Sequence, residues 1–159
     1  MNTRTITMAG LALLALGCSG NSAGVTADLP TGWENAKSVT SFSQAACGGS
    51  PLDPAAAPEA IDVTVAAGSI HVAYHHAHFR CEQAVEGFVR TGSNAVDFLV
   101  QPTDMNPSKV AKCDCLYEIT MTANTSAGPT AVTVYRQWDH VGGNPIDPVE
   151  VGTASVTVP

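Results

Sequence analysis

Alternation of apolar and polar residues in the segment CDCLYEITMTA, residues 113–123, is the feature that most limits how this chain can fold. The residues that share one face of this pattern are Cys113, Cys115, Tyr117, Ile119 and Met121. Successive side chains of a β-strand point to opposite faces of the sheet, so a period of two predicts a strand with one face in a core. Both cysteines are therefore expected to point into the core.

Shorter alternating segments follow the same pattern, and turns rich in Gly, Pro or Asn separate them. We expect strands at residues 61–67, 69–76, 82–90, 94–101, 113–123, 130–138 and 149–158, and residues 36–47 can hold a further, first strand. No segment has the period of a useful amphipathic helix. About seven short strands predict an all-β fold, an antiparallel β-sandwich with an immunoglobulin-like or transthyretin-like topology.

The first twenty residues have the features of an export signal. Arg4 supplies a positive charge, and the apolar stretch from Met8 to Leu16 is too short to span a bilayer and leads into Cys18. This segment, ending in ALGC, resembles a bacterial lipoprotein signal peptide with its lipobox. The resemblance implies that residues 1–17 are removed and that Cys18 is acylated, for example with palmitate. Because Ser19 follows the cysteine, the resemblance also implies the outer membrane rather than the inner membrane.

The residues after the cysteine predict a tether followed by one domain. Residues 18–32 are mostly small and polar and should form a lipidated, flexible tether. Trp33 is expected to be the first anchor of the folded part, and residues 33–159 suit a single sandwich domain with one core. No later stretch is long and apolar enough to cross a membrane, so we expect an extracytoplasmic protein anchored through lipid.

Four cysteines remain for the folded domain: Cys47, Cys81, Cys113 and Cys115. An even number of cysteines outside the cytoplasm predicts disulfides, which would stabilise the sandwich. A bond between the two cysteines of the C-x-C pair would close a very tight ring, which strand geometry excludes. Both remaining pairings join the C-x-C pair to Cys47 and Cys81. A thiolate metal or redox site is the alternative, but C-x-C lacks the usual C-x-x-C spacing.

The net charge and the absence of certain motifs exclude several classes of function. The chain has 14 acidic and 7 basic side chains, so it lacks the basic surface that nucleic acid requires. It contains no G-x-S-x-G nucleophile motif and no phosphate-binding glycine loop, so we expect no catalytic residues, no resident cofactor and no enzymatic activity.

Four of the five histidines lie between residues 71 and 78, in the segment HVAYHHAHFRC. On a continuous strand, His71 and His75 would point to one side and His76 and His78 to the other. The H-x-H spacing of His76 and His78 can offer two imidazoles to one copper or zinc ion. A third ligand would come from another strand, and the candidates are His140, Asp139 and Asp97. If the strand ends near Tyr74, three of the four histidines could converge instead.

The strand CDCLYEITMT, with its C-x-C pair, is similar to small uncharacterised secreted lipoproteins that carry a tether and a β-sandwich. We therefore expect a membrane-anchored, non-enzymatic binding or structural module of the cell envelope, with a protein or glycan partner. A copper- or zinc-binding lipoprotein that uses His71, His75, His76, His78 or His140 is the alternative, and a hydrolase is a distant third.

Overall fold

The computed structural model describes residues 28–49, 58–106, 113–138 and 147–159. These residues form strands and turns but no helix, so they include no helix that could cross a membrane. The strands are β1 (Lys37–Ser38), β2 (Ser41–Gln44), β3 (Ala60–Ala66), β4 (Ser69–Arg80), β5 (Val85–Thr91), β6 (Ala95–Pro102), β7 (Asp114–Asn124), β8 (Gly128–Arg136) and β9 (Val149–Val158). The predicted signal peptide and Cys18 lie outside the described residues.

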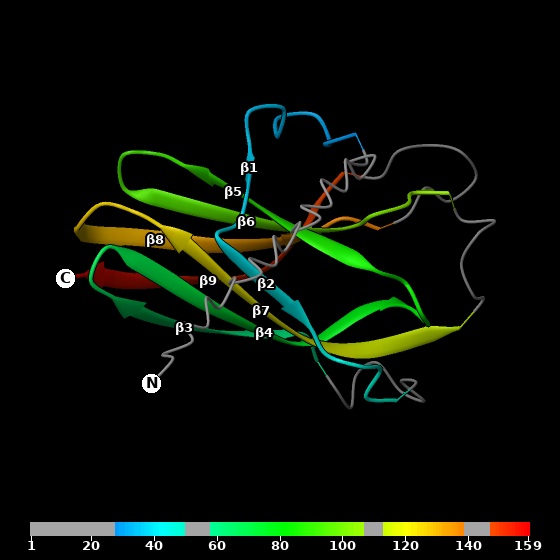
Figure 1. Cartoon of the computed structure of the whole chain (residues 1–159). Coiled ribbons are helices and arrows are strands. Elements are labelled where there is room, and N and C mark those ends of the chain that lie inside the picture. Colours follow the sequence, from blue (N-terminus) through cyan, green and yellow to red (C-terminus); the bar gives the residue numbers. More distant parts are fainter. Residues whose placement is uncertain (1–27, 50–57, 107–112, 139–146) are drawn as a thin grey trace, which may run out of the picture.

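The strands form two sheets that pack face to face, as Figure 1 shows. The five-stranded sheet has the order β1-β5-β6-β8-β9, and the four-stranded sheet has the order β2-β7-β4-β3. All described pairs of strands are antiparallel except β6 and β8, which are parallel. The predicted all-β sandwich is confirmed. The described residues form nine strands, because residues 37–44 form two short strands where one was expected. Residues 149–158 form one long strand.

Alternation along the strands fills the space between the sheets. In β7 the buried positions are those of Cys115, Tyr117, Ile119, Met121 and Ala123, and they share one cluster with residues of β4, β6 and β8. Apolar area removed from water in this way is the main favourable term in folding. The period of two in the sequence therefore reports directly which residues form the core.

The chain passes from one sheet to the other between β1 and β2. Ser38 pairs with Phe88 of the five-stranded sheet, and Ser41 pairs with Thr122 of the four-stranded sheet. Gly87 of β5 lies directly under Phe42 of β2: a Cβ atom on Gly87 would lie 2.7 Å from Cδ2 of Phe42. The glycine lets the two sheets approach closely on this side of the sandwich.

A second, smaller apolar cluster lies on the outer face of the five-stranded sheet. Trp33, which is 3% exposed, packs with Phe88 and Leu99, and Leu29 also contacts this cluster. The guanidinium of Arg90 lies 4.2 Å from the centre of the Trp33 ring, a cation–π distance. Trp33 therefore anchors the N-terminal segment, which crosses the outer face of this sheet before β1 begins.

Two disulfides join the four domain cysteines. Cys47 is bonded to Cys115 and Cys81 to Cys113, with Cα–Cα distances of 5.8 and 5.5 Å. The structure thus selects one of the two pairings that the sequence left open. Cys115 is buried in the core, as expected, but Cys113 precedes β7 and is exposed, so the expected core position was wrong for Cys113. Disulfides are typical of an oxidising, extracytoplasmic compartment.

Candidate functional site

A β-bulge in β4 decides where the histidines point. Tyr74 pairs with Ile119 and Ala77 pairs with Tyr117, so His75 and His76 together lie opposite the single residue Glu118 of β7. His76 has a φ of 54°, in the left-handed region that a non-glycine residue rarely adopts. Two residues facing one across an antiparallel pair define a bulge, and bulges change the direction of the side chains that follow.

The bulge shifts the alternation of β4 by one residue. Before it, Ile70, Val72 and Tyr74 are buried; after it, Ala77 and Phe79 are buried. The residues between them, His71, His75 and His78, therefore lie on the outer face of the four-stranded sheet. His78 therefore shares the face of His71 and His75, and the arrangement expected for a continuous strand does not hold for His78, because β4 is interrupted by the bulge.

His75 lies between two carboxylates from neighbouring strands. Its Nδ1 is 2.5 Å from Oε2 of Glu118 on β7, and its Nε2 is 3.2 Å from Oδ2 of Asp62 on β3. The other oxygen of Glu118, Oε1, accepts the backbone N–H of His76 at 3.2 Å. The hydrogen bond to Glu118 is the largest effect and raises the pKa of His75 above its ordinary value. Burial opposes it and is the second-largest effect, and the charge of Glu118 and the hydrogen bond and charge of Asp62 add smaller increases.

The other described histidines each have separate surroundings. The Nδ1 of His71 is 3.0 Å from the hydroxyl of Thr122, and its Nε2 is 3.3 Å from the hydroxyl of Ser69. The Nδ1 of His76 donates to the carbonyl of Pro58 at 3.2 Å. The Nε2 of His78 is buried and has no hydrogen-bond partner among the described residues.

The structure does not assemble these histidines into a metal centre. Within the described ranges, no group of three or more His, Cys, Asp or Glu side chains is placed to hold a metal ion. Asp97 lies on β6 in the other sheet, where its carboxylate accepts a hydrogen bond of 2.8 Å from Nε of Arg90. His140 and Asp139 lie outside the described residues.

A polar cluster bridges the two sheets beyond the end of β3. Glu59 accepts hydrogen bonds from the hydroxyl of Tyr74 and, at 3.0 Å, from the backbone N–H of His78. Nη2 of Arg136, on β8, lies 3.2 Å from Oε2 of Glu59, and Nη1 donates to the carbonyl of His78 at 3.0 Å. These side chains take the place of a neighbouring strand for the backbone of His78. Burial, followed by the charge of Glu59, raises the pKa of Tyr74.

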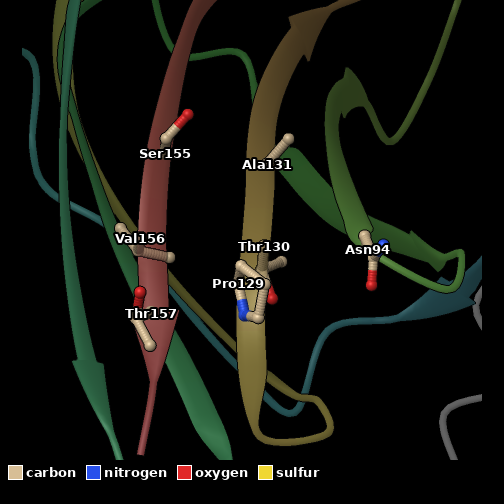
Figure 2. Close-up of a pocket in the computed structure, with 7 residues that line it drawn as sticks. All are labelled: Asn94, Pro129, Thr130, Ala131, Ser155, Val156 and Thr157. Atoms are coloured by element: carbon tan, nitrogen blue, oxygen red, sulfur yellow. The ribbon is translucent and has the colours of Figure 1, made fainter.

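An open depression of about 370 Å³ lies at the end of the sandwich where β3–β4, β5–β6 and β7–β8 turn. Figure 2 shows its lining: Asn94, Pro129, Thr130, Ala131, Ser155, Val156 and Thr157. A second depression of about 410 Å³ lies beside it, between the β5–β6 and β7–β8 turns. Hydroxyl and amide groups line both depressions, and the first also exposes the apolar side chains of Pro129, Ala131 and Val156. The lining residues of neither depression include a charged or aromatic side chain, so both suit contact with an uncharged molecule.

Sequence reasoning singled out the histidines but missed their carboxylate partners. Asp62, Glu118 and Glu59 lie 13, 43 and 15 residues from the side chains that they contact, so only strand pairing brings them together. The bulge did leave a signal: the apolar positions of β4 change from even numbers (Ile70 to Tyr74) to odd numbers (Ala77 and Phe79). That change of phase could have predicted the bulge and the common outer face.

Comparison with known proteins finds no matching family model, no matching curated protein and no matching solved structure.

Proposed function

We propose that the protein is a lipid-anchored, extracytoplasmic module of the cell envelope that binds a partner or supports the envelope without catalysis. The observation that carries this proposal is the pair of disulfides, Cys47–Cys115 and Cys81–Cys113. Disulfides form and persist in oxidising compartments. They agree with the export signal and lipobox of the sequence, in which Cys18 receives the acyl chains and the outer membrane is the destination.

The anchored N-terminal segment supports an orientation for the domain. Trp33 and Leu29 pack on the outer face of the five-stranded sheet, so the chain enters the domain across that face. Ten residue steps separate Cys18 from Asp28, and at roughly 3.5 Å per residue they reach at most about 35 Å. This short reach favours an arrangement with the five-stranded sheet towards the membrane and the outer face of the four-stranded sheet away from it.

The outer face of the four-stranded sheet is then the surface that a partner meets first. Its rows of paired positions carry small and polar residues, including Ser41, Thr64, His71, Ala73, Thr120 and Thr122. Two exposed acidic residues, Asp62 and Glu118, give the face a mixed polar and acidic character. A protein or glycan partner with hydrogen-bonding groups fits this surface better than nucleic acid, since phosphates would be repelled.

Lipidation is tested by labelling cells that express the full chain with an alkynyl palmitate. We expect label on the wild-type protein, none on a Cys18→Ala variant, and recovery of the wild-type protein with outer membranes. A soluble, unlabelled wild-type protein would refute the anchor. Recovery of labelled protein with inner membranes would refute only the choice of membrane.

Partner binding is tested with a photo-crosslinking amino acid at Thr120, on the outer face of the four-stranded sheet, and at Thr153, on β9 of the other sheet. Both positions are exposed threonines on strands, so they form a matched pair. We expect a discrete crosslinked product from Thr120 in intact cells and none from Thr153. Crosslinking from Thr153 alone would place the partner on the other sheet, and the proposed face would be wrong.

The copper- or zinc-binding alternative receives less support from the described residues. Both ring nitrogens of His75 face carboxylates on opposite sides of the ring, so Asp62, His75 and Glu118 cannot chelate one ion together. The alternative then rests on His76 and His78 with ligands outside the described residues, such as His140. Calorimetric titration with copper and zinc tests it, with a His76→Ala/His78→Ala variant as the control.

A further inference from the structure

The carboxylates on both sides of His75 fix its protonation state. An ionised carboxylate can only accept hydrogen bonds, and each ring nitrogen of His75 faces one such oxygen, on Glu118 or Asp62. A neutral imidazole has one N–H and one lone pair, so it can satisfy only one of these two contacts. The geometry therefore requires the imidazolium, with an N–H directed to each side.

The three side chains connect three strands. Asp62 belongs to β3, which is the edge of its sheet, His75 to β4, and Glu118 to β7. Glu118 also holds the bulge, because its second oxygen accepts the N–H of His76. We infer that Asp62, His75 and Glu118 form a proton-dependent connection that fastens edge strand β3 and the β4 bulge to β7, and that weakens when His75 loses its proton.

The two contacts are unequal, which indicates the one that opens. The distance from His75 is 2.5 Å to Glu118 and 3.2 Å to Asp62, and the Asp62 side chain is 81% exposed against 52% for Glu118. The single N–H of neutral His75 stays with the closer carboxylate, and its lone pair then faces Asp62 and repels it. Deprotonation releases a proton to solvent and loosens β3 while the bulge remains bonded to Glu118.

The groups that face His75 are few. From β3 the charged group is Asp62, from β7 it is Glu118, and β4 itself carries His71 four residues earlier and His76 next in the chain. Among the described residues, no lysine or arginine bonds to either carboxylate. The proton on His75 thus supplies the positive charge that lies between these two carboxylates.

The sign of the pH effect follows from the raised pKa of His75. A group whose pKa is higher in the folded chain contributes stability that is complete below its unfolded pKa of about 6.5 and is lost as pH rises through the folded value. We therefore expect β3 to be held more firmly in mildly acidic solution, below about pH 6.5, than in alkaline solution. This inference does not depend on the lipid anchor or on the identity of a partner.

The inference is tested by measuring the pKa of His75 by proton NMR of the mature chain. The titration runs from about pH 5 to about pH 10, a range that includes the ordinary histidine pKa of about 6.5. We expect the pKa of His75 above 6.5 in the wild-type chain, and lowered towards about 6.5 by Glu118→Gln and, less strongly, by Asp62→Asn. Glu150→Gln, a matched change on β9, should leave it unchanged. A wild-type pKa at or below 6.5 would overturn the inference.

The pH dependence of amide hydrogen exchange in β3 is a second test. If His75 only packed against its neighbours, protection of β3 would not change with its protonation. After correction for the intrinsic effect of pH, we expect exchange in β3 to be about two- to fivefold faster above the His75 pKa than below it, the range for one exposed ion pair. Asp62→Asn should remove this difference while β7 stays protected. Equal protection of β3 at both pH values in the wild-type chain would overturn the inference. If Glu118→Gln fails to fold, Asp62→Asn alone provides the variant for both measurements.

Discussion

Removal of the disulfides should cost most of the stability of this domain. Cys47 and Cys115 are 68 residues apart and Cys81 and Cys113 are 32 apart, and the shorter loop lies within the longer one. When Cys81–Cys113 is formed, it bridges the loop closed by Cys47–Cys115, so the effective length of that loop falls from 68 to about 36 residues. Chain-entropy arithmetic then gives about 3.8 kcal/mol for loss of Cys47–Cys115, about 3.1 for loss of Cys81–Cys113, and about 7.5 for loss of both.

The burial of Cys115 adds to the difference in stability that is lost when each disulfide is removed. Cys115 is fully buried, so its replacement by alanine also removes a sulfur atom from the core, whereas Cys113 is exposed. Loss of a buried group of this size costs roughly 1 kcal/mol more. We therefore expect Cys47→Ala/Cys115→Ala to be the more damaging pair of substitutions. Because domains of this size have about 5–15 kcal/mol of stability in total, the fully reduced chain should be close to unfolded.

Equilibrium unfolding in urea, followed by the fluorescence of Trp33 and Trp138, measures these losses in the mature chain with Cys18→Ser. Thiol alkylation of the unfolded, oxidised protein should find no reactive cysteine, which shows that all four domain cysteines are bonded. The wild-type protein in reductant is the control for the loss of both bonds. A loss below about 1 kcal/mol for Cys47→Ala/Cys115→Ala, or a larger loss for the other pair, would refute the loop argument.

Two further predictions concern packing between the sheets. Gly87→Ala places a Cβ atom 2.7 Å from Phe42 and should cost about 1–3 kcal/mol of unfolding free energy, whereas Gly92→Ala, with no contact below 3.8 Å, should change it by less than about 0.5. Arg136→Met leaves the carboxylate of Glu59, 19% exposed, without its cation and should cost about 3 kcal/mol. The double variant Glu59→Gln/Arg136→Met should lose less unfolding free energy than Arg136→Met alone, because no unpaired carboxylate remains. Urea unfolding of all four variants tests the glycine prediction and the Glu59–Arg136 prediction.

The strands could be predicted from the sequence because burial of one face is a local property. Each apolar residue at an alternate position, such as Ile119 in β7 or Phe98 in β6, carries its own signal of facing inward. The pairing of strands carries no such signal, since the hydrogen bonds of the backbone are the same for any partner. The contact of Glu59 with Arg136, between opposite sheets, follows only once the strand order is known.

The bulge in β4 shows how packing overrides a regular pattern and determines the polar face. A continuous strand would bury His76 and His78 and expose Ala77 and Phe79. Exposure of Phe79 alone would cost about 2 kcal/mol, and burial of the His76 imidazole in the core without a partner would cost about 1–3 kcal/mol. The bulge instead costs about 1–2 kcal/mol for the left-handed backbone of His76, and Glu118 bonds the N–H that leaves the ladder. The core therefore favours the bulge by a few kcal/mol, and the common outer face of the histidines is a consequence of where Phe79 must go.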